Sequence, residues 1–373
     1  MLKSLKYSES AGQPQEWRLE RTEFGRVNLL VGKNSTGKSR AMNTLAGLAH
    51  ILSGKLSIAY QSGAFEAEFE LEHGAYELEL HMHAGNVVRE VLRVNGALVL
   101  ERSEEGRGRI WFEQLQEFVA FELDPRQFAL PNRRDKLQHP FAVELAEWAA
   151  GVTLVPFGSE LGKRELALGQ AAIIQSAGRL QDRPSLINVY ISSFVAYGAD
   201  YDHAIVRCMQ KLGYSISAVY AKQLPADLFP GLQDAPIGLV IHDDELNLEI
   251  PQTHMSQGQY RALALVIHLN AAMFSGSETL CLIDDIGEGL DYERASLLVE
   301  IAIELAEQSQ LQLVMTSNDR FVMNKVPLQY WAVLERKKHT VRAYTARNSP
   351  HAFEDFKFLG LSNFDFFTAG RYH

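Results

Sequence analysis

The chain has 373 residues, of which 46% are hydrophobic, so it is long enough for one large domain or two ordinary ones. Its formal net charge of -10 at pH 7 argues against a surface that is generally suited to nucleic acid, but it does not exclude a local basic groove. No apolar run approaches the ~18 residues of a membrane span, and the N-terminus lacks a charged-then-apolar leader pattern. The widely separated Cys208 and Cys281 predict core thiols, and together these features predict a reduced, cytoplasmic protein.

Residues 1–31 predict strands that lead into a glycine-rich loop. The apolar run from Val27 to Val31 is typical of a buried strand, and apolar residues from Met42 to Leu52 recur at helical spacing. The segment between them fits the phosphate-loop pattern G-x-x-x-x-G-K-[ST] at every fixed position: Gly32-Lys33-Asn34-Ser35-Thr36-Gly37-Lys38-Ser39.

This strand, loop and helix start supply what a nucleoside triphosphate needs. Glycines let backbone N–H groups close around phosphate oxygens, and a helix N-terminus adds positive potential. We expect Lys38 to contact the β- and γ-phosphates and the Ser39 hydroxyl to bind Mg²⁺. The nucleotide-binding residues predicted here are Asn34, Ser35, Thr36, Gly37, Lys38, Ser39 and Arg40.

Residues 56–100 predict an antiparallel sheet with one acidic face. Hydrophobic residues and glutamates alternate in segments 65–72 and 76–80, which places the glutamates on one side of each strand. Asn95-Gly96, between two apolar runs, is typical of a two-residue hairpin. The acidic face should repel DNA.

A basic stretch follows in a charged loop. It comprises Arg126, Arg133, Arg134 and Lys136. These side chains could contact phosphate groups of a ligand or could form a solvated loop, and the sequence leaves both interpretations open.

Helical patterning dominates the middle of the chain up to Gln223. It covers segments 160–180, 184–198 and 200–212. Residues 224–238 contain three prolines and predict a loop, and a short strand pair follows at 238–242 and 247–250. The helical block is therefore predicted to be a lobe inserted between two parts of one core.

Three further stretches complete a nucleotide site. Ser256-Gln257-Gly258-Gln259 precedes an apolar helix, with Ser256 suited to its N-cap. The apolar run 280–283 delivers Asp284 and Asp285 at a strand end, where an α/β sheet places Mg²⁺ ligands, before a helix from Tyr292 to about Glu307. The third stretch, a buried strand at 311–316, ends in Ser317-Asn318-Asp319.

This set of motifs resembles ABC-type ATPases of the SMC/RecF/OLD (overcoming-lysogenization-defect) group. Ser256-Gln257-Gly258-Gln259 is similar to the signature motif, and Asp284-Asp285 to the Walker B pair. Leu290-Asp291 is similar to the D-loop, and Thr316-Ser317-Asn318-Asp319 to the switch segment. The resemblance covers about residues 1–55 and 237–335.

The resemblance implies an α/β fold, an ABC-type P-loop NTPase core with an antiparallel β subdomain and an inserted helical lobe. We expect the split core at 1–155 and 237–345, the lobe at 156–236 and a C-terminal tail at 346–373. The tail packs six phenylalanines into residues 353–367, a density that predicts docking either on its own core or on a partner.

The resemblance also implies an ATP hydrolase that uses Mg²⁺. It implies that the nucleotide also contacts Ser256, Gln257, Gly258 and Gln259. The metal ligands that it implies are Ser39 and Asp284, and the catalytic residues are Asp285, Glu288 and Asn318. Asp285 stands where a glutamate is usual, with Glu288 as the rival base, and Asn318 stands where a histidine is usual. An amide cannot shuttle a proton, so both departures predict slow hydrolysis.

In this group the signature of one subunit closes the site on the other subunit's phosphate loop, which implies a homodimer around ATP. The resemblance does not exclude a higher oligomer. The chain shows no Toprim nuclease domain, zinc-hook cysteines or long coiled coils, which predicts a stand-alone OLD-like ATPase. Our first hypothesis is that it gates a separate effector, a nuclease or toxin, in a bacterial anti-phage defence system. The alternative is a RecF-like DNA-binding clamp in recombination and repair, which the acidic sheet face disfavours.

Overall fold

The computed structural model describes residues 1–56, 59–103, 105–158, 161, 163, 166, 185–224, 236–357 and 360–373. The strands of this part are β1 (Leu2–Glu9), β2 (Trp17–Glu23), β3 (Val27–Val31), β4 (Ser62–Leu71), β5 (Gly74–His83), β6 (Asn86–Val94), β7 (Ala97–Ser103), β8 (Arg107–Phe112), β9 (Glu117–Glu122), β10 (Val152–Pro156), β11 (Ile216–Gln223), β12 (Ile237–Asp243), β13 (Leu248–Pro251), β14 (Thr279–Asp284), β15 (Leu311–Thr316), β16 (Trp331–Lys337) and β17 (Thr340–Thr345). Its helices are α1 (Lys38–Leu52), α2 (Ala129–Asn132), α3 (Pro140–Ala150), α5 (Leu186–Tyr197), α6 (Ala199–Lys211), α7 (Gln257–Ser275), α8 (Tyr292–Glu307), α9 (Arg320–Lys325), α10 (Pro350–Lys357) and α11 (Asn363–Thr368), with a 3-10 turn η2 (Leu328–Tyr330).

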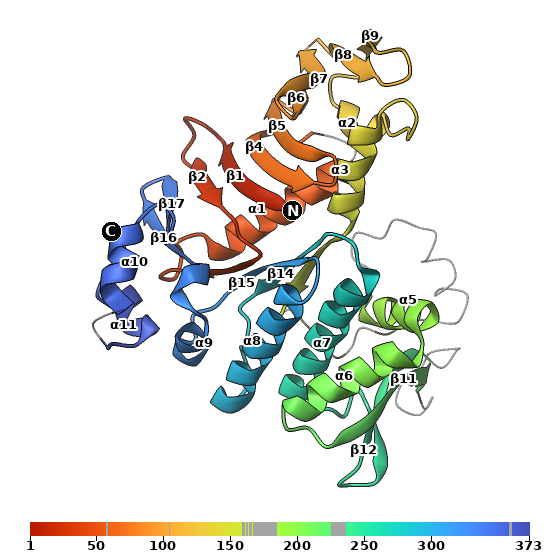
Figure 1. Ribbon diagram of the computed structural model, residues 1–373, viewed down its shortest axis with the longest axis vertical. Coiled ribbons are helices and arrows are strands. Elements are labelled where there is room, and N and C mark those ends of the chain that lie inside the picture. Colours follow the sequence, from red (N-terminus) through yellow and green to blue (C-terminus); the bar gives the residue numbers. More distant parts are fainter. Residues whose placement is uncertain are drawn as a thin grey trace.

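One sheet of fourteen strands runs through the molecule, in the order β10-β14-β15-β3-β16-β17-β2-β1-β4-β5-β6-β7-β8-β9 (Figure 1). The first five strands of this order pair in parallel. The inner strands β14, β15 and β3 are buried on both faces, as is typical of parallel strands covered by helices, whereas most of the edge strand β10 is half-buried. On β14, Leu280 and Leu282 face one hydrophobic core, whereas Cys281 and Ile283 face the other.

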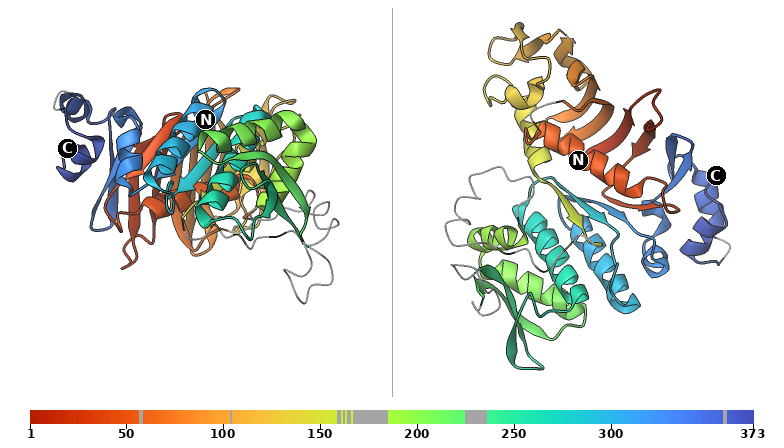
Figure 2. Two further views of the ribbon diagram at one scale, coloured as in Figure 1. Left: turned by 90° about the horizontal axis from the view of Figure 1, so that it is seen from below. Right: turned by 180° about the vertical axis from the view of Figure 1, so that it is seen from behind.

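Helices cover both faces of this parallel part. The core on one face contains α1 and α3, and the core on the other contains α7 and α8. Figures 1 and 2 show α1 and α7 on opposite sides of the strands. The phosphate loop and the signature segment therefore begin helices on opposite faces of one sheet. The predicted α/β fold with a P-loop core is confirmed.

Beyond β16, β17 pairs antiparallel with β16 and parallel with β2, and the strands from β2 to β9 in this order pair antiparallel with one another and form the predicted antiparallel subdomain. Asn95 and Gly96 both have positive φ, 51° and 77°, and join β6 to β7 as a two-residue hairpin. On the acidic face, glutamates of β4 pair with cations of β1 and β2, as in Lys6–Glu66 at 2.8 Å. These exposed pairs neutralise part of that face.

The middle of the chain differs from its prediction in one element. Helices α5 and α6 agree with the predicted segments 184–198 and 200–212, but the helical patterning predicted up to Gln223 is wrong over β11. β11 pairs antiparallel with β12, and β13 completes a second, three-stranded sheet. The predicted helix at 160–180 and the predicted loop at 224–238 lie mostly outside the described residues. The domain boundaries stay a prediction.

Each of the four cationic side chains of the basic stretch contacts another residue of the chain. Arg126 pairs with Asp124 at 3.0 Å, and the Arg134 guanidinium donates to the Ser53 carbonyl at 3.1 Å. The other two cations contact the ring of Phe121 and the carboxylate of Glu147. These contacts favour a structural interpretation of the stretch over a free phosphate-binding patch. Among the described residues, no helix is long and apolar enough to span a membrane.

The aromatic tail docks on its own core. Phe353, Phe356 and Phe366 are 2%, 3% and 0% exposed. The Phe366 ring lies 4.7 Å from that of Phe353 and 6.4 Å from that of Trp331 at the start of β16. These contacts support the first of the two interpretations that the sequence left open.

Because Phe366 is central to this packing, Phe366→Ala should lower the free energy of unfolding by about 3–5 kcal/mol, as expected for a buried phenylalanine. Urea denaturation followed by circular dichroism measures the loss. Leu361→Ala, at a tail position that is 51% exposed, is the control and should change stability by less than about 0.5 kcal/mol. Equal, small effects of both variants would contradict the docked arrangement.

Candidate nucleotide site

The phosphate loop takes its predicted place between β3 and α1. Gly37 precedes the helix with φ of 107°, a backbone conformation that side chains with a Cβ rarely adopt. A Cβ built on Gly32 would lie 2.6 Å from Thr36 Oγ1, so the loop is also too tight there for any other residue. Asn34, Ser35 and Ser39 are exposed along this loop, while the buried Thr36 hydroxyl donates to the Lys33 carbonyl at 2.8 Å.

Lys38 folds back over the loop. Its side chain is mostly buried, and Nζ donates to the Gly32 carbonyl oxygen at 2.9 Å. Burial lowers the pKa of Lys38, and the charges of Asp285 and Asp284 oppose that shift. The loop lysine and the two predicted Walker B carboxylates therefore lie close enough to interact electrostatically.

Arg40 is held by the antiparallel subdomain. Its Nε donates to Glu9 Oε1 at 2.9 Å, and its guanidinium lies 4.8 Å from the centre of the Trp17 ring. Trp17 is fully buried, and its ring would lie 3.2 Å from a Cβ on Gly37. The Trp17 ring thus supports both the loop and Arg40. The sequence predicted Arg40 as a site residue but did not predict this role of Trp17.

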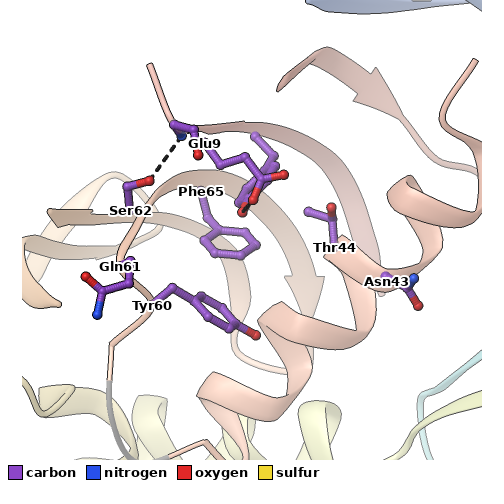
Figure 3. A pocket seen from close by; sticks show the side chains of 9 residues that line it. Glu9, Asn43, Thr44, Tyr60, Gln61, Ser62 and Phe65 are labelled. Carbon is purple, nitrogen blue, oxygen red and sulfur yellow. Dashed lines mark hydrogen bonds between the residues drawn. The ribbon is translucent and has the colours of Figure 1, made fainter. Parts of the chain in front are cut away.

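A hollow of about 360 Å³ lies beside the first turns of α1 (Figure 3). Figure 3 shows Thr44 and Asn43 of α1 on one side and Tyr60 and Phe65 on the other. Two hydrogen bonds join polar groups of its lining: the Tyr7 hydroxyl donates to Glu9 Oε2 at 3.1 Å, and the Ser10 amide donates to Ser62 Oγ at 3.1 Å. It neighbours the Arg40–Glu9 pair but does not include the phosphate loop.

Both carboxylates stand at the end of one parallel strand, β14, next to the end of its neighbour β15. Asp284 ends β14, and its Oδ1 accepts a hydrogen bond of 2.6 Å from the hydroxyl of Thr316, which ends β15. Asp285 has a left-handed φ of 56°, which aspartate adopts more readily than most residues. Burial raises the pKa of Asp285. The negative charges of Asp284 and Glu288 raise this pKa further, and the positive charge of Lys38 opposes the shift.

Glu288 and Asn318 are both exposed at the edge of this site. A Cβ on Gly158, just after β10, would lie 2.7 Å from Glu288 Oε2 and 3.6 Å from the Asp285 Cβ. Segment 156–158 thus forms one wall of the site, and the sequence did not reveal it. Asn318 is flanked by Asp319, whose carboxylate caps α9 by accepting from the amides of Phe321 and Val322.

The donor set suits Mg²⁺ in the presence of a nucleotide. Among the described residues, no group of three or more His, Cys, Asp or Glu side chains is arranged to hold a metal by itself. Mg²⁺ commonly takes one or two carboxylates and completes its shell with phosphate and water. A carboxylate at Asp284 and an exposed hydroxyl at Ser39 fit that requirement.

The signature segment packs against the D-loop segment of its own chain. Ser256 caps α7 by accepting a hydrogen bond of 3.1 Å from the Gln259 amide, and Gln257 donates to the Leu161 carbonyl at 2.7 Å. A Cβ on Gly258 would lie 3.0 Å from the Gly289 carbonyl. Arg261 Nη1 adds a bond of 2.9 Å to the Glu288 carbonyl. The structure therefore brings the signature to residues 288–290, on the opposite face of the sheet from α1.

Comparison with known proteins identifies the group to which this site belongs. Residues 27–324 match the family model described as "AAA domain, putative AbiEii toxin, Type IV TA system". A search of curated proteins found no match. Among solved structures, an SMC head bound to the C-winged helix domain of ScpA aligns with a TM-score of 0.52 and 13% identity, over 92% of this chain and 96% of that one.

A second solved structure is an SMC head with an extended coiled coil, bound to the C-terminal domain of ScpA derived from Pyrococcus furiosus. It aligns with a TM-score of 0.51 and 11% identity, over 96% of this chain and 100% of that one. At such low identity these likenesses show the fold alone, which is the head fold that the resemblance to ABC-type ATPases implied. Since the family model spans the phosphate loop, the signature and the Walker B pair, the chain belongs to this AAA ATPase family and has the ABC-type head fold.

Proposed function

We propose that the protein binds ATP on residues 34–40 and hydrolyses it slowly with Mg²⁺. One observation carries the proposal: Lys38, in the loop after β3, interacts electrostatically with Asp284 and Asp285, at the end of β14, at the edge of the sheet where parallel strands β14, β15 and β3 all end. A lysine beside two carboxylates is the set that phosphoryl transfer uses to neutralise phosphate, hold a metal and position water.

Each side chain would have a separate role. Lys38 would bind the phosphates, Ser39 and Asp284 would hold Mg²⁺, and Asp285 would orient the attacking water and accept its proton. When bound, Mg²⁺ would neutralise charge on the transferred phosphate. A carboxylate whose pKa is raised by burial is the stronger base, which supports Asp285 in this role. Its protonation at acid pH should stop turnover.

Two features support slow turnover. Asp285 is one methylene shorter than glutamate, so it reaches less far into the site. The exposed Asn318 can donate to a phosphate oxygen but cannot exchange a proton with it. Slow hydrolysis suits a timer that stays closed while ATP is bound.

We also propose that ATP closes a homodimer in which Ser256–Gln259 of one subunit meet the phosphate loop of the other. The position of α7 on the face opposite α1 supports this arrangement, because the helices that follow the signature and the phosphate loop pack in different cores of one subunit. The solved SMC heads are bound to domains of ScpA, and by analogy this ATPase would act through a separate protein. An anti-phage effector, a nuclease or a toxin, is the partner that we propose.

Asp285→Asn tests the catalytic assignment. We expect retained ATP binding, turnover lowered by at least about 100-fold, the usual contribution of a general base, and accumulation of the closed dimer. Phosphate release and size-exclusion chromatography with ATP measure these effects. Glu288→Gln is the matched control, since it neutralises the neighbouring carboxylate. If Asp285→Asn turns over normally and Glu288→Gln does not, Glu288 is the base.

The effector is tested separately, by purifying the protein with the products of its neighbouring genes, with and without ATP. Copurification of a nuclease or toxin that depends on ATP would support the defence role. Copurification of recombination proteins would support the RecF-like alternative instead.

A further inference from the structure

The hydroxyl of Thr316 joins the ends of two strands at the centre of the site. We propose that Thr316 is a positioning residue, which fixes the orientation of the Mg²⁺-binding carboxylate of Asp284 and the backbone of Asp285. This inference rests on the proposed ATPase function and adds a residue to which the sequence gave no role of its own.

Thr316 is fully buried at the end of β15, the parallel neighbour of β14. Its Oγ1 donates to Asp284 Oδ1 at 2.6 Å and accepts from the Asp285 amide at 2.8 Å. A hydroxyl has a single proton, so donating it to the carboxylate leaves its oxygen to accept from the amide. The two bonds therefore reinforce one orientation. A bond from O–H to a charged carboxylate is also among the stronger hydrogen bonds in proteins.

The first bond restrains the metal ligand. Among the described hydrogen bonds, those to the Asp284 side chain involve Oδ1 alone. The Thr316 hydroxyl thus holds one carboxylate oxygen and leaves the other available to a cation. Partners of this kind orient metal ligands, and their loss typically costs 10–100-fold in metal affinity or activity.

The second bond restrains the catalytic carboxylate. Asp285 sits at a left-handed φ of 56°, a conformation that persists where surrounding contacts fix it. The Asp285 amide donates a hydrogen bond to the Thr316 hydroxyl, and the Ile286 amide donates a second one, of 2.9 Å, to the Thr316 carbonyl. Side chain and backbone of Thr316 together therefore hold residues 284–286.

The same residue links the metal site to the switch segment. Ser317, next in the chain, donates its hydroxyl to the Ile286 carbonyl at 3.2 Å and accepts from the Asp319 amide at 3.1 Å. Asn318 lies between these anchored residues. The hydrogen bonds of Ser317 would thus resist a displacement of Asn318 by a bound γ-phosphate, directly next to the bonds of Thr316 that orient Asp284 and Asp285.

Thr316→Val is the direct test, because it removes the hydroxyl and nearly conserves the volume. We expect a rise of about 10-fold or more in the Mg²⁺ concentration for half-maximal ATP turnover, or a fall of about 10–100-fold in turnover. ATP binding in EDTA, measured by calorimetry, should stay within about 2-fold of wild type, because a metal-ligand positioner has no role there. Thr316→Ser keeps the hydroxyl and should restore the Mg²⁺ dependence.

Thr279→Val is the matched control. Thr279 begins the same strand β14, far from Asp284, and its buried hydroxyl has no hydrogen-bond partner among the described residues. Its replacement should leave the Mg²⁺ dependence unchanged. Thr316→Ala removes the hydroxyl without adding a methyl group and takes the place of Thr316→Val if that variant does not fold.

Three outcomes separate this inference from the proposed function. A wild-type Mg²⁺ dependence and turnover in Thr316→Val would overturn the positioning role while leaving the ATPase assignment intact. Equal loss of metal-free and metal-dependent binding would assign Thr316 to stability alone and would also overturn it. Absence of Mg²⁺-dependent turnover in the wild-type protein would overturn the proposed function, and this inference with it.

Discussion

Replacement of Lys38 by alanine is expected to abolish ATP binding while the fold stays intact. A charge-assisted hydrogen bond to phosphate contributes about 1.5–3 kcal/mol, or about 10–150-fold in affinity, before longer-range Coulomb attraction is counted. Lys38 is also the cation that opposes the rise in the pKa of Asp285 that burial and the neighbouring carboxylates cause. Without it, a nucleotide polyphosphate would meet Asp284 and Asp285 with no compensating lysine.

Calorimetric titration with ATP and Mg²⁺ measures the loss. Lys33→Ala is the matched control, because Lys33 belongs to the same loop and is exposed. It should change affinity by less than about 5-fold, since an exposed charge contributes about 1 kcal/mol or less. Thermal melting shows whether Lys38→Ala is folded. Wild-type ATP affinity in a folded Lys38→Ala protein would refute the assignment of the loop.

The parallel core could be predicted from the sequence because local patterns determine it. Largely apolar runs at 27–31, 280–283 and 311–316 are typical of strands buried on both faces, and all three lie in the parallel part of the sheet. The glycine loop and the Asn95-Gly96 hairpin were equally predictable, because their backbone conformations favour few residue types.

β11 was missed because its identity depends on a distant partner. Its residues alternate only weakly between buried and exposed positions, and they follow directly on the amphipathic α6. What makes the segment a strand is pairing with β12, as in Val219 opposite Ile241. Such pairing is a tertiary effect that a local periodicity does not report.

The same limit applies to the site. Asp284, Asp285 and Lys38 could be predicted because they stand in recognisable motifs. Trp17, Gly158 and Thr316 could not, because each acts on a residue far away in the chain. For Thr316 one signal was present, a hydroxyl directly after the apolar residues 313–315, but only the adjacency of β14 and β15 gives it a partner.

The composite site gives the second large effect. If Ser256 meets a phosphate bound to the other subunit, Ser256→Arg should leave ATP binding to the monomer unchanged and abolish turnover, because a long side chain blocks closure. The exposed Ser256 caps α7, so its loss also costs the helix about 1 kcal/mol. Ser362→Arg removes an equally exposed cap from α11, remote from the site, and should turn over like wild type.

Mixing Ser256→Arg with Lys38→Ala should then restore activity that neither variant has alone. A mixed dimer pairs the intact phosphate loop of one subunit with the intact signature of the other, so one of its two sites is complete. At equal amounts with random exchange, about half of the dimers are mixed, and turnover should peak there. A site built within one subunit offers no such rescue, since each chain would carry its own lesion. No rescue despite demonstrated subunit exchange would leave two explanations, a site in one subunit or an obligatory coupling of both sites. Cysteine crosslinking between positions 38 and 256 of different chains decides between them, because only the composite site brings these positions together across the dimer.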